Sequence, residues 1–276
     1  MTSPDLAQPR AGVHHGSFEA LRRRPVVLGL VGLLALLVAI IAGVAMGTVA
    51  VPAAETIAIL AHRVGWPVEE AWAASSETIV VTLRLPRVLT ALVVGLGLSV
   101  AGVTYQGLLR NPLADPYVLG TASGAALGAA IGVLLPIQLS WLGLGLTNIF
   151  AFVGALLAIS IVYRIAGGGG RSTMTSILLT GYAVGSMLAA GLSLAMYLSG
   201  AQLRQIFYYL LGSLSGSDWQ SLALGLPVVA IGTVLILVRA RSLNGLLLGD
   251  DTALHLGVDV RRERAIPVSY THLRAH

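Results

Sequence analysis

The sequence contains no cysteine and no lysine, and charged residues make up only 11% of its 276 positions. The absence of cysteine excludes disulfide bonds and thiolate chemistry. A soluble domain carries about 25% charged residues, so this chain cannot cover itself with a polar surface in water. Because 56% of its residues are hydrophobic, the composition predicts a protein that is solvated by lipid.

Ionisable side chains are also missing from the middle of every long apolar segment. Proton and ion relays place such groups inside the membrane, so the pattern disfavours a proton-coupled pump and an intramembrane metal or hydrolase site. No GxxxxGK[ST] phosphate loop is present, since the glycine run at 167–170 is not followed by lysine. We therefore predict no catalytic residues, no metal ligands and no cofactor bound by this chain.

Apolar segments long enough to cross a bilayer recur along the chain, because a crossing helix needs about 20 apolar residues. We predict an all-α, polytopic bundle of transmembrane helices. Its six spans are expected at about 26–50, 86–108, 118–136, 141–163, 174–198 and 220–238. Residues 1–24 form a polar N-terminal tail, and residues 52–83, with Trp66 and Trp72, form an interfacial excursion on the outer face.

The arginines indicate the orientation of the spans. If the N-terminus is cytoplasmic, the outer segments contain only four arginines, Arg63, Arg84, Arg87 and Arg204. The other arginines fall in inner segments or in the two ends of the chain, which fits the excess of positive charge in cytoplasmic loops. We predict a multi-pass protein of the cell membrane with a cytoplasmic N-terminus. The same excess explains the formal charge of +5 without a nucleic-acid partner.

Small residues recur at intervals of four in three spans, and such residues share one helix face. Small faces let helix backbones approach closely in lipid, so we interpret them as packing surfaces rather than as parts of a pore. The three sets are Gly120, Gly124, Gly128 and Gly132; Ala91, Gly95 and Ser99; and Gly181, Gly185, Ala189 and Ser193.

Two motifs flank the second span. Arg84-Leu85-Pro86-Arg87 precedes it, and proline at a helix start costs no hydrogen bond. The two guanidiniums would anchor the helix at the interface or bind a carboxylate on an extracytoplasmic partner. The second motif, at 106–116, holds two prolines four residues apart, which predicts a rigid turn on the inner face.

A third motif, at 243–258, follows the last span and reads as two short helices. Gly249 and Gly257 fit helix stops, and Asp250 or Asp251 fits the N-cap of the second helix. The leucines of this segment lie on helices too short to be stable alone in water, so we expect a soluble partner to cover them.

In this order and spacing, the three motifs, together with LLGSLSGSDW before the last span, resemble the FecCD-like permeases of type II ABC importers over residues 25–264. The resemblance implies that Arg84 and Arg87 meet acidic residues of a substrate-binding protein. It implies that Asn111, Leu113 and Thr175 belong to a cytoplasmic gate. It also implies that residues 244–258 are coupling helices that contact an ATPase, with Leu246, Leu247, Gly249, Asp250, Leu254 and Gly257 as the contact residues.

The function that the resemblance implies is transport of an iron–siderophore, haem or cobalamin-type chelate, with no chemistry performed by the permease itself. Its expected partners are ABC ATPase subunits that bind ATP, an extracytoplasmic substrate-binding protein, and a second permease copy as a homodimer or heterodimer. The alternatives are a secondary transporter acting without an ATPase and a membrane scaffold that transports nothing.

The sequence departs from the family pattern in one respect. The family has about ten spans, whereas six are counted here, and the segment 265–276 is polar and does not resemble a span. We expect a C-terminally truncated reading frame in which this last segment is foreign to the family.

Overall fold

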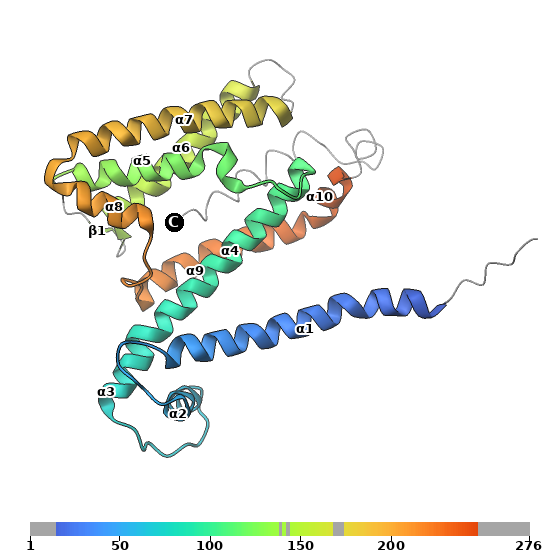
Figure 1. Cartoon of the computed structure of the whole chain (residues 1–276), viewed down its shortest axis with the longest axis vertical. Helices are drawn as coiled ribbons and strands as arrows, with labels where there is room; N and C mark the ends of the chain where they lie inside the picture. Colours follow the sequence, from blue (N-terminus) through green and yellow to red (C-terminus); the bar gives the residue numbers. More distant parts are fainter. Residues whose placement is uncertain (1–14, 138–139, 142–143, 168–173, 248–276) are drawn as a thin grey trace, which may run out of the picture. The chain divides into compact units, whose positions relative to one another are not determined.

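The computed structural model describes residues 15–137, 140–141, 144–167 and 174–247. Within these residues all regular secondary structure is helical apart from one short hairpin, which confirms the all-α class (Figure 1). The chain divides into two compact units, Met1–Val80 and Val81–His276.

The first unit contains α1 (His15–Ala45), α2 (Ala53–Arg63) and α3 (Ala74–Glu77). Residues Val26–Ala45 of α1 are long and apolar enough to cross a membrane. The helix ends five residues before the predicted end of the first span, at residue 50. An ion pair joins the end of α2 to α3, with the Arg63 Nη2 2.7 Å from the Glu77 Oε1. His62 also contacts the Trp72 ring edge to face.

The second predicted span is part of a longer helical run. The π-helical turn η1 (Thr78–Arg84) leads directly into α4 (Leu85–Leu109), and the run Ala74–Leu109 has 36 residues. At 1.5 Å per residue it rises about 54 Å, more than the roughly 30 Å of a bilayer core. Pro86 lies in the first turn of α4, as predicted for a proline that begins a helix.

The third predicted span, 118–136, is shorter than expected. The 3-10 turn η2 (Pro116–Leu119) and Gly120 take its first residues, and α5 (Thr121–Leu134) has only 14 residues. Such a helix rises about 21 Å, which is less than the thickness of a bilayer core. The described residues therefore hold five helices that satisfy the length of a membrane span, with α5 as a shorter apolar helix beside them.

The remaining helices follow the predicted spans closely. The antiparallel pair β1 (Ser140–Trp141) and β2 (Leu144–Gly145) takes the residues expected to begin the fourth span, and α6 runs over Leu146–Gly167. The fifth and sixth spans are α7 (Met174–Leu198) and α9 (Trp219–Val238). Between these two helices lie η3 (Gly200–Gln202) and α8 (Leu203–Leu211), and α10 (Ala240–Leu247) follows α9.

The glycines of α5 bring its backbone against two neighbouring helices. A Cβ atom added at Gly128 would overlap the carbonyl oxygen of Phe150 in α6, and one at Gly154 would overlap that of Gly124. At Gly120, where φ is +74°, an added Cβ would lie 3.0 Å from the backbone of Gly185 in α7. The prediction that these faces serve helix packing is therefore confirmed for α5 and for the middle of α7 at Gly185.

The small-residue face of α4 behaves differently. Ala91, Gly95 and Ser99 are exposed, and no described atom lies within 4 Å of a Cβ added at Gly95. Instead, α4 lies beside α9 (Figure 1) and packs through Val93 against Leu222 and Val229. Among the described residues, the packing role predicted for this α4 face is therefore not observed.

Candidate functional site

The turn after α4 has the rigid form that its sequence predicts. Arg110 ends the helix in the left-handed conformation, with φ of 49°. The Asn111 Oδ1 accepts the backbone N–H of Leu113 at 2.9 Å, and the Asp115 Oδ1 accepts that of Tyr117 at 2.9 Å. Short carboxylate and amide side chains favour such turns because they bond their own backbone two residues on. The turn therefore has a fixed backbone.

Both predicted gate residues in this turn are exposed. Asn111 is exposed, and Leu113 is 87% exposed at the tip of the turn. An apolar side chain held outward by a rigid turn leaves a contact surface for another molecule or for another part of the assembly.

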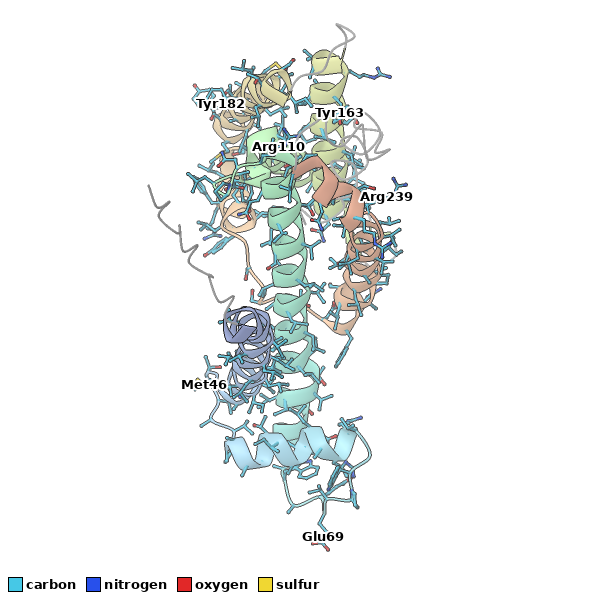
Figure 2. The ribbon with its side chains drawn as sticks, turned by 90° about the vertical axis from the view of Figure 1, so that its right-hand side faces the viewer. Met46, Glu69, Arg110, Tyr163, Tyr182 and Arg239 are labelled. Carbon is cyan, nitrogen blue, oxygen red and sulfur yellow. The ribbon has the colours of Figure 1, made fainter. Side chains whose placement is uncertain are left out.

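Beneath the turn, a group of buried residues joins six elements into what we call the turn cluster. It consists of Tyr105, Leu108, Leu119, Ile159, Val162, Ala166, Ile177, Val184, Ile236 and Leu243. These residues come from α4, η2, α6, α7, α9 and α10. Figure 2 shows Arg110, Tyr163 and Arg239 toward the same end of the second unit. The turn cluster therefore connects the ends of several helices.

The third predicted gate residue lies near this cluster. Thr175 is exposed in the first turn of α7, two residues before Ile177, which is 4% exposed and belongs to the turn cluster. The structure thus anchors the start of α7 and the 110–115 turn on one buried group.

The predicted coupling segment begins on the same cluster. Leu243 is 9% exposed and belongs to the turn cluster, and α10 packs against α4. Leu247 is 48% exposed. The side chain of Leu246 and the positions Gly249, Asp250, Leu254 and Gly257 lie outside the described residues.

At the opposite end of α4, the two predicted docking arginines have different surroundings. Arg84 is only 7% exposed, so it is not presented on the surface of this chain. Arg87 is exposed, and it donates from Nε to the Leu214 carbonyl at 3.1 Å and from Nη2 to the Ser215 carbonyl at 2.9 Å. The docking role of both residues stays a prediction.

The segment before α9 has a further tie to the same end of α4. The Trp219 indole N–H donates to the Val81 carbonyl at 3.0 Å. Asp218 caps α9 by accepting the Ser221 N–H at 2.8 Å. Hydrogen bonds from the side chain and backbone of Ser221 hold the pKa of the exposed Asp218 carboxyl below its usual range, so the cap is ionised at neutral pH.

Sequence reasoning missed one polar face and placed one of its residues, Ser193, on a packing surface. On α7, Tyr182, Ser186, Ser193 and Tyr197 follow Thr175 at helical spacing, and all of them are exposed. Tyr182 and Tyr197 are 75% and 85% exposed. The signal was visible, since residues four and eleven apart return to one helix face. This hydroxyl face runs along the length of a helix that is apolar enough to span a membrane.

Among the residues that the structure describes, no three His, Asp or Glu side chains gather as a metal site would require. The described residues instead present a hydrogen-bonded turn, a hydroxyl face on α7 and the exposed Leu247 on α10.

Comparison with known proteins gives a consistent result. The profile of the FecCD transport family matches residues 35–273, which includes most of the segment 265–276. The cobalamin import permease BtuC of Halobacterium salinarum is 39% identical over 192 residues, covering 70% of this chain and 51% of that protein. The haemin permease HmuU of Yersinia pestis is 38% identical over 66% of this chain and 55% of its own length.

The chain thus spans about half the length of these two permeases. An uncharacterised ABC transporter permease of Bacillus subtilis, YvrB, is 34% identical over 88% of this chain and 69% of that protein. A solved structure of a metal-chelate type ABC transporter in an inward-facing conformation has a TM-score of 0.72 at 24% identity, covering 91% of this chain and 74% of the other. At that identity the likeness concerns the fold alone.

Proposed function

The chain belongs to the FecCD transport family, and we propose that it forms a membrane-spanning subunit of an ABC importer that moves a chelate into the cytoplasm. The candidate substrates are an iron–siderophore, haem and a cobalamin. Relatives named for cobalamin, haemin and Fe(3+)-citrate import support this class. A permease subunit of this kind performs no chemistry and holds no cofactor, because ATP is bound by its partner.

The observation that carries the proposal is the convergence at the turn cluster. The 110–115 turn, α7 and α10 are far apart in sequence, yet each packs on this cluster, the turn through Ala114, α7 through Ile177 and α10 through Leu243. Packed interiors resist gradual deformation. A displacement of α10 would therefore be transmitted to the turn and to α7 together, which is what a gate operated by an ATPase requires.

The hydroxyl face of α7 supports a translocation path. Tyr182, Ser186 and Ser193 present polar groups along a membrane-spanning helix, and polar groups facing hydrocarbon are costly unless they are satisfied. The Ser193 hydroxyl bonds the Ala189 carbonyl at 3.0 Å, but a row of hydroxyls is better solvated by water or by a polar ligand. We propose that this face lines the path, opposite a second permease copy.

The energy for transport comes from outside the chain in this proposal. The expected partners are ATPase subunits on the cytoplasmic side and a substrate-binding protein on the other side. The exposed Leu247 at the end of α10 supports the first of these, because an apolar side chain on an eight-residue helix gains stability from a covering partner.

Leu247→Asp tests this function. The variant should insert and fold normally, but it should lose both the copurifying ATPase and the uptake of labelled cobalamin, haem or ferric siderophore, because a buried carboxylate without a partner is costly. Val64→Asp, at a residue 88% exposed in the segment between the first two predicted spans, is the matched control and should retain both activities. Normal ATPase recovery and uptake with Leu247→Asp would overturn the contact role of α10, whereas uptake by a wild-type permease with which no ATPase copurifies would favour a secondary transporter.

A further inference from the structure

The short helix α2 has two sides of opposite character. Ile57, Leu60 and Val64 recur at intervals of three and four residues, so they share one helix face, which we call the α2 stripe. Ile57 and Val64 are 49% and 88% exposed, and Leu60 is half-buried. His62 is two positions from both Leu60 and Val64, which is about 160° around a helix of 3.6 residues per turn. The stripe and the polar side of α2 therefore face in opposite directions.

The stripe is also separate from the contacts that α2 makes within its own unit. Thr56 and Ile59 are fully buried, and α2 packs against α1 and α3. The loop after α2 is bound on the polar side, where the His62 Nε2 lies 3.3 Å from the Glu70 Oε1 and the His62 ring meets that of Trp72. These contacts lie outside the stripe, whose two ends stay exposed.

A tryptophan is fixed at the end of the stripe. Gly65 has a positive φ of 91°, and its N–H donates to the His62 carbonyl at 2.9 Å. The Trp66 N–H donates to the Ala61 carbonyl at 3.0 Å. This pair of bonds is a glycine-terminated helix end that fixes the backbone of the next residue. Trp66 is 71% exposed, and an exposed indole of this kind favours the membrane–water interface, because its ring is apolar and its N–H is polar.

The place of α2 in the chain brings it to a membrane surface. Helix α1, whose residues Val26–Ala45 can cross a membrane, ends at Ala45, and α2 begins at Ala53. Figure 1 shows α1 from the side and α2 end-on, and the turned view of Figure 2 shows the reverse. Helix α2 thus runs across the direction of α1. A helix that crosses a membrane-spanning neighbour in this way lies along the surface of the bilayer.

The charges of this segment indicate which lipids it fits. Residues 53–77 contain a single arginine, Arg63, and four glutamates, Glu55, Glu69, Glu70 and Glu77. The arginine is paired with Glu77 at 2.7 Å. Anionic headgroups attract clusters of basic residues, and this segment has an excess of acidic ones. Its affinity for a bilayer must therefore come from apolar area and from the tryptophan ring.

We propose that α2 is an interfacial helix whose stripe, together with Trp66, is immersed in the headgroup–acyl boundary of the bilayer at the C-terminal end of α1. Its partner is uncharged or zwitterionic lipid, and the loop at 67–73 faces water. The Arg63–Glu77 pair connects this anchor to α3, where the helical run Ala74–Leu109 begins. The anchor thereby holds the start of that run at the level of the headgroups. The inference does not depend on what the chain transports.

Single spin labels test the immersion, because the chain has no cysteine of its own. Ile57→Cys, Val64→Cys and Glu69→Cys are labelled in the full chain, reconstituted in phosphatidylcholine vesicles. Relaxation by oxygen, which concentrates in lipid, is compared with relaxation by a water-soluble nickel chelate. The labels at 57 and 64 should respond several-fold more to oxygen than to nickel. Glu69, exposed in the loop (Figure 2), is the matched control, and its label should respond in the reverse order.

A second arm tests the apolar basis of the anchor. Val64→Asp should shift the label at Ile57→Cys toward the nickel response, because a carboxylate in an apolar contact is costly, whereas Val64→Leu should leave it unchanged. The spanning helices keep Val64→Asp in the membrane, so its ATPase recovery and uptake should stay normal. Anionic phosphatidylglycerol added to the vesicles should not deepen either label of the stripe.

Each outcome decides the proposal. Labels at 57 and 64 that nickel relaxes as strongly as the label at 69 would place the stripe in water and overturn it. Labels that neither reagent relaxes would reveal a protein cover, such as a second copy of the chain, and would also overturn it. Deeper labels in anionic vesicles would overturn the apolar basis. A wild-type permease without uptake would count against the importer function and leave the label measurements unaffected.

Discussion

At the residue scale, glycines have opposite surroundings although their sequence patterns look alike. A side chain at Gly128 would overlap the Phe150 carbonyl, whereas one at Gly95 would meet nothing within 4 Å among described atoms. In lipid, helices associate by close packing rather than by a hydrophobic drive. The first position therefore determines how closely α5 and α6 approach, and the second does not contribute to packing between described helices.

This difference predicts opposite signs for the same substitution. Gly128→Ala should lower the stability of the purified protein by about 1–3 kcal/mol or more, because the backbone must shift to admit a methyl group. Gly95→Ala should be neutral or stabilising by up to about 1 kcal/mol, because alanine favours the helix. Thermal melting of the two variants in detergent measures the difference. Equal melting temperatures would contradict the close α5–α6 contact.

At the element scale, the short helix α8 is held by one buried apolar residue and one polar contact. Ile206 is 1% exposed, and the Tyr209 hydroxyl donates to the Asn148 Oδ1 at 2.9 Å. Burial raises the pKa of the Tyr209 phenol above its ordinary value. Asn148 lies in the first turn of α6, so this bond fixes α8 to the start of a spanning helix.

The raised pKa predicts an alkaline loss of stability. A group whose pKa is higher when folded stabilises the protein fully below its unfolded pKa, here about 10, and the contribution is lost as the pH rises through the folded value. Tyr209→Phe should therefore cost about 1 kcal/mol near neutral pH, and the cost should shrink above about pH 10. Melting curves across this pH range give the test, and a cost that stays constant above about pH 10 would contradict it.

At the scale of the whole molecule, the second unit has two distinct ends. The N-terminal end of α4 carries Arg87 and its contacts with residues 214–215, while the C-terminal end adjoins the turn cluster through Leu108. This arrangement agrees with the alternation of outer and inner segments expected from the arginines. The chain is a multi-pass membrane protein, and its orientation is the remaining prediction at this scale.

Single cysteines test the orientation, because the chain has none of its own. Cysteine at Ser17, Ser172 or Ser242 should resist an impermeant thiol reagent in intact cells, since these positions fall in the predicted inner segments. Cysteine at Ser75 should react, and all four should react after permeabilisation. Labelling of Ser172→Cys from outside would reverse the predicted topology.

The limits of sequence reasoning appear at particular elements. Spans five and six matched α7 and α9 closely. Each is a long apolar run bounded by polar residues, so the helix can begin and end at few other positions. Span three was predicted too long, because η2 and Gly120 are as apolar as a helix and differ only in backbone conformation. The π-helical start of the α4 run gave no signal either, since its composition is that of an ordinary span.

The sequence by itself determined that the chain is solvated by lipid, how many apolar segments it has, the turn at 110–115 and the family. These properties depend on local composition and on motifs. Only the tertiary structure decided that Arg84 is buried, that Arg87 holds carbonyls 127 and 128 residues away, and that the 110–115 turn, α7 and α10 share the turn cluster. Helical periodicity indicates which residues share a face. It does not indicate what covers that face, because the covering residues come from distant parts of the chain and are set by packing alone.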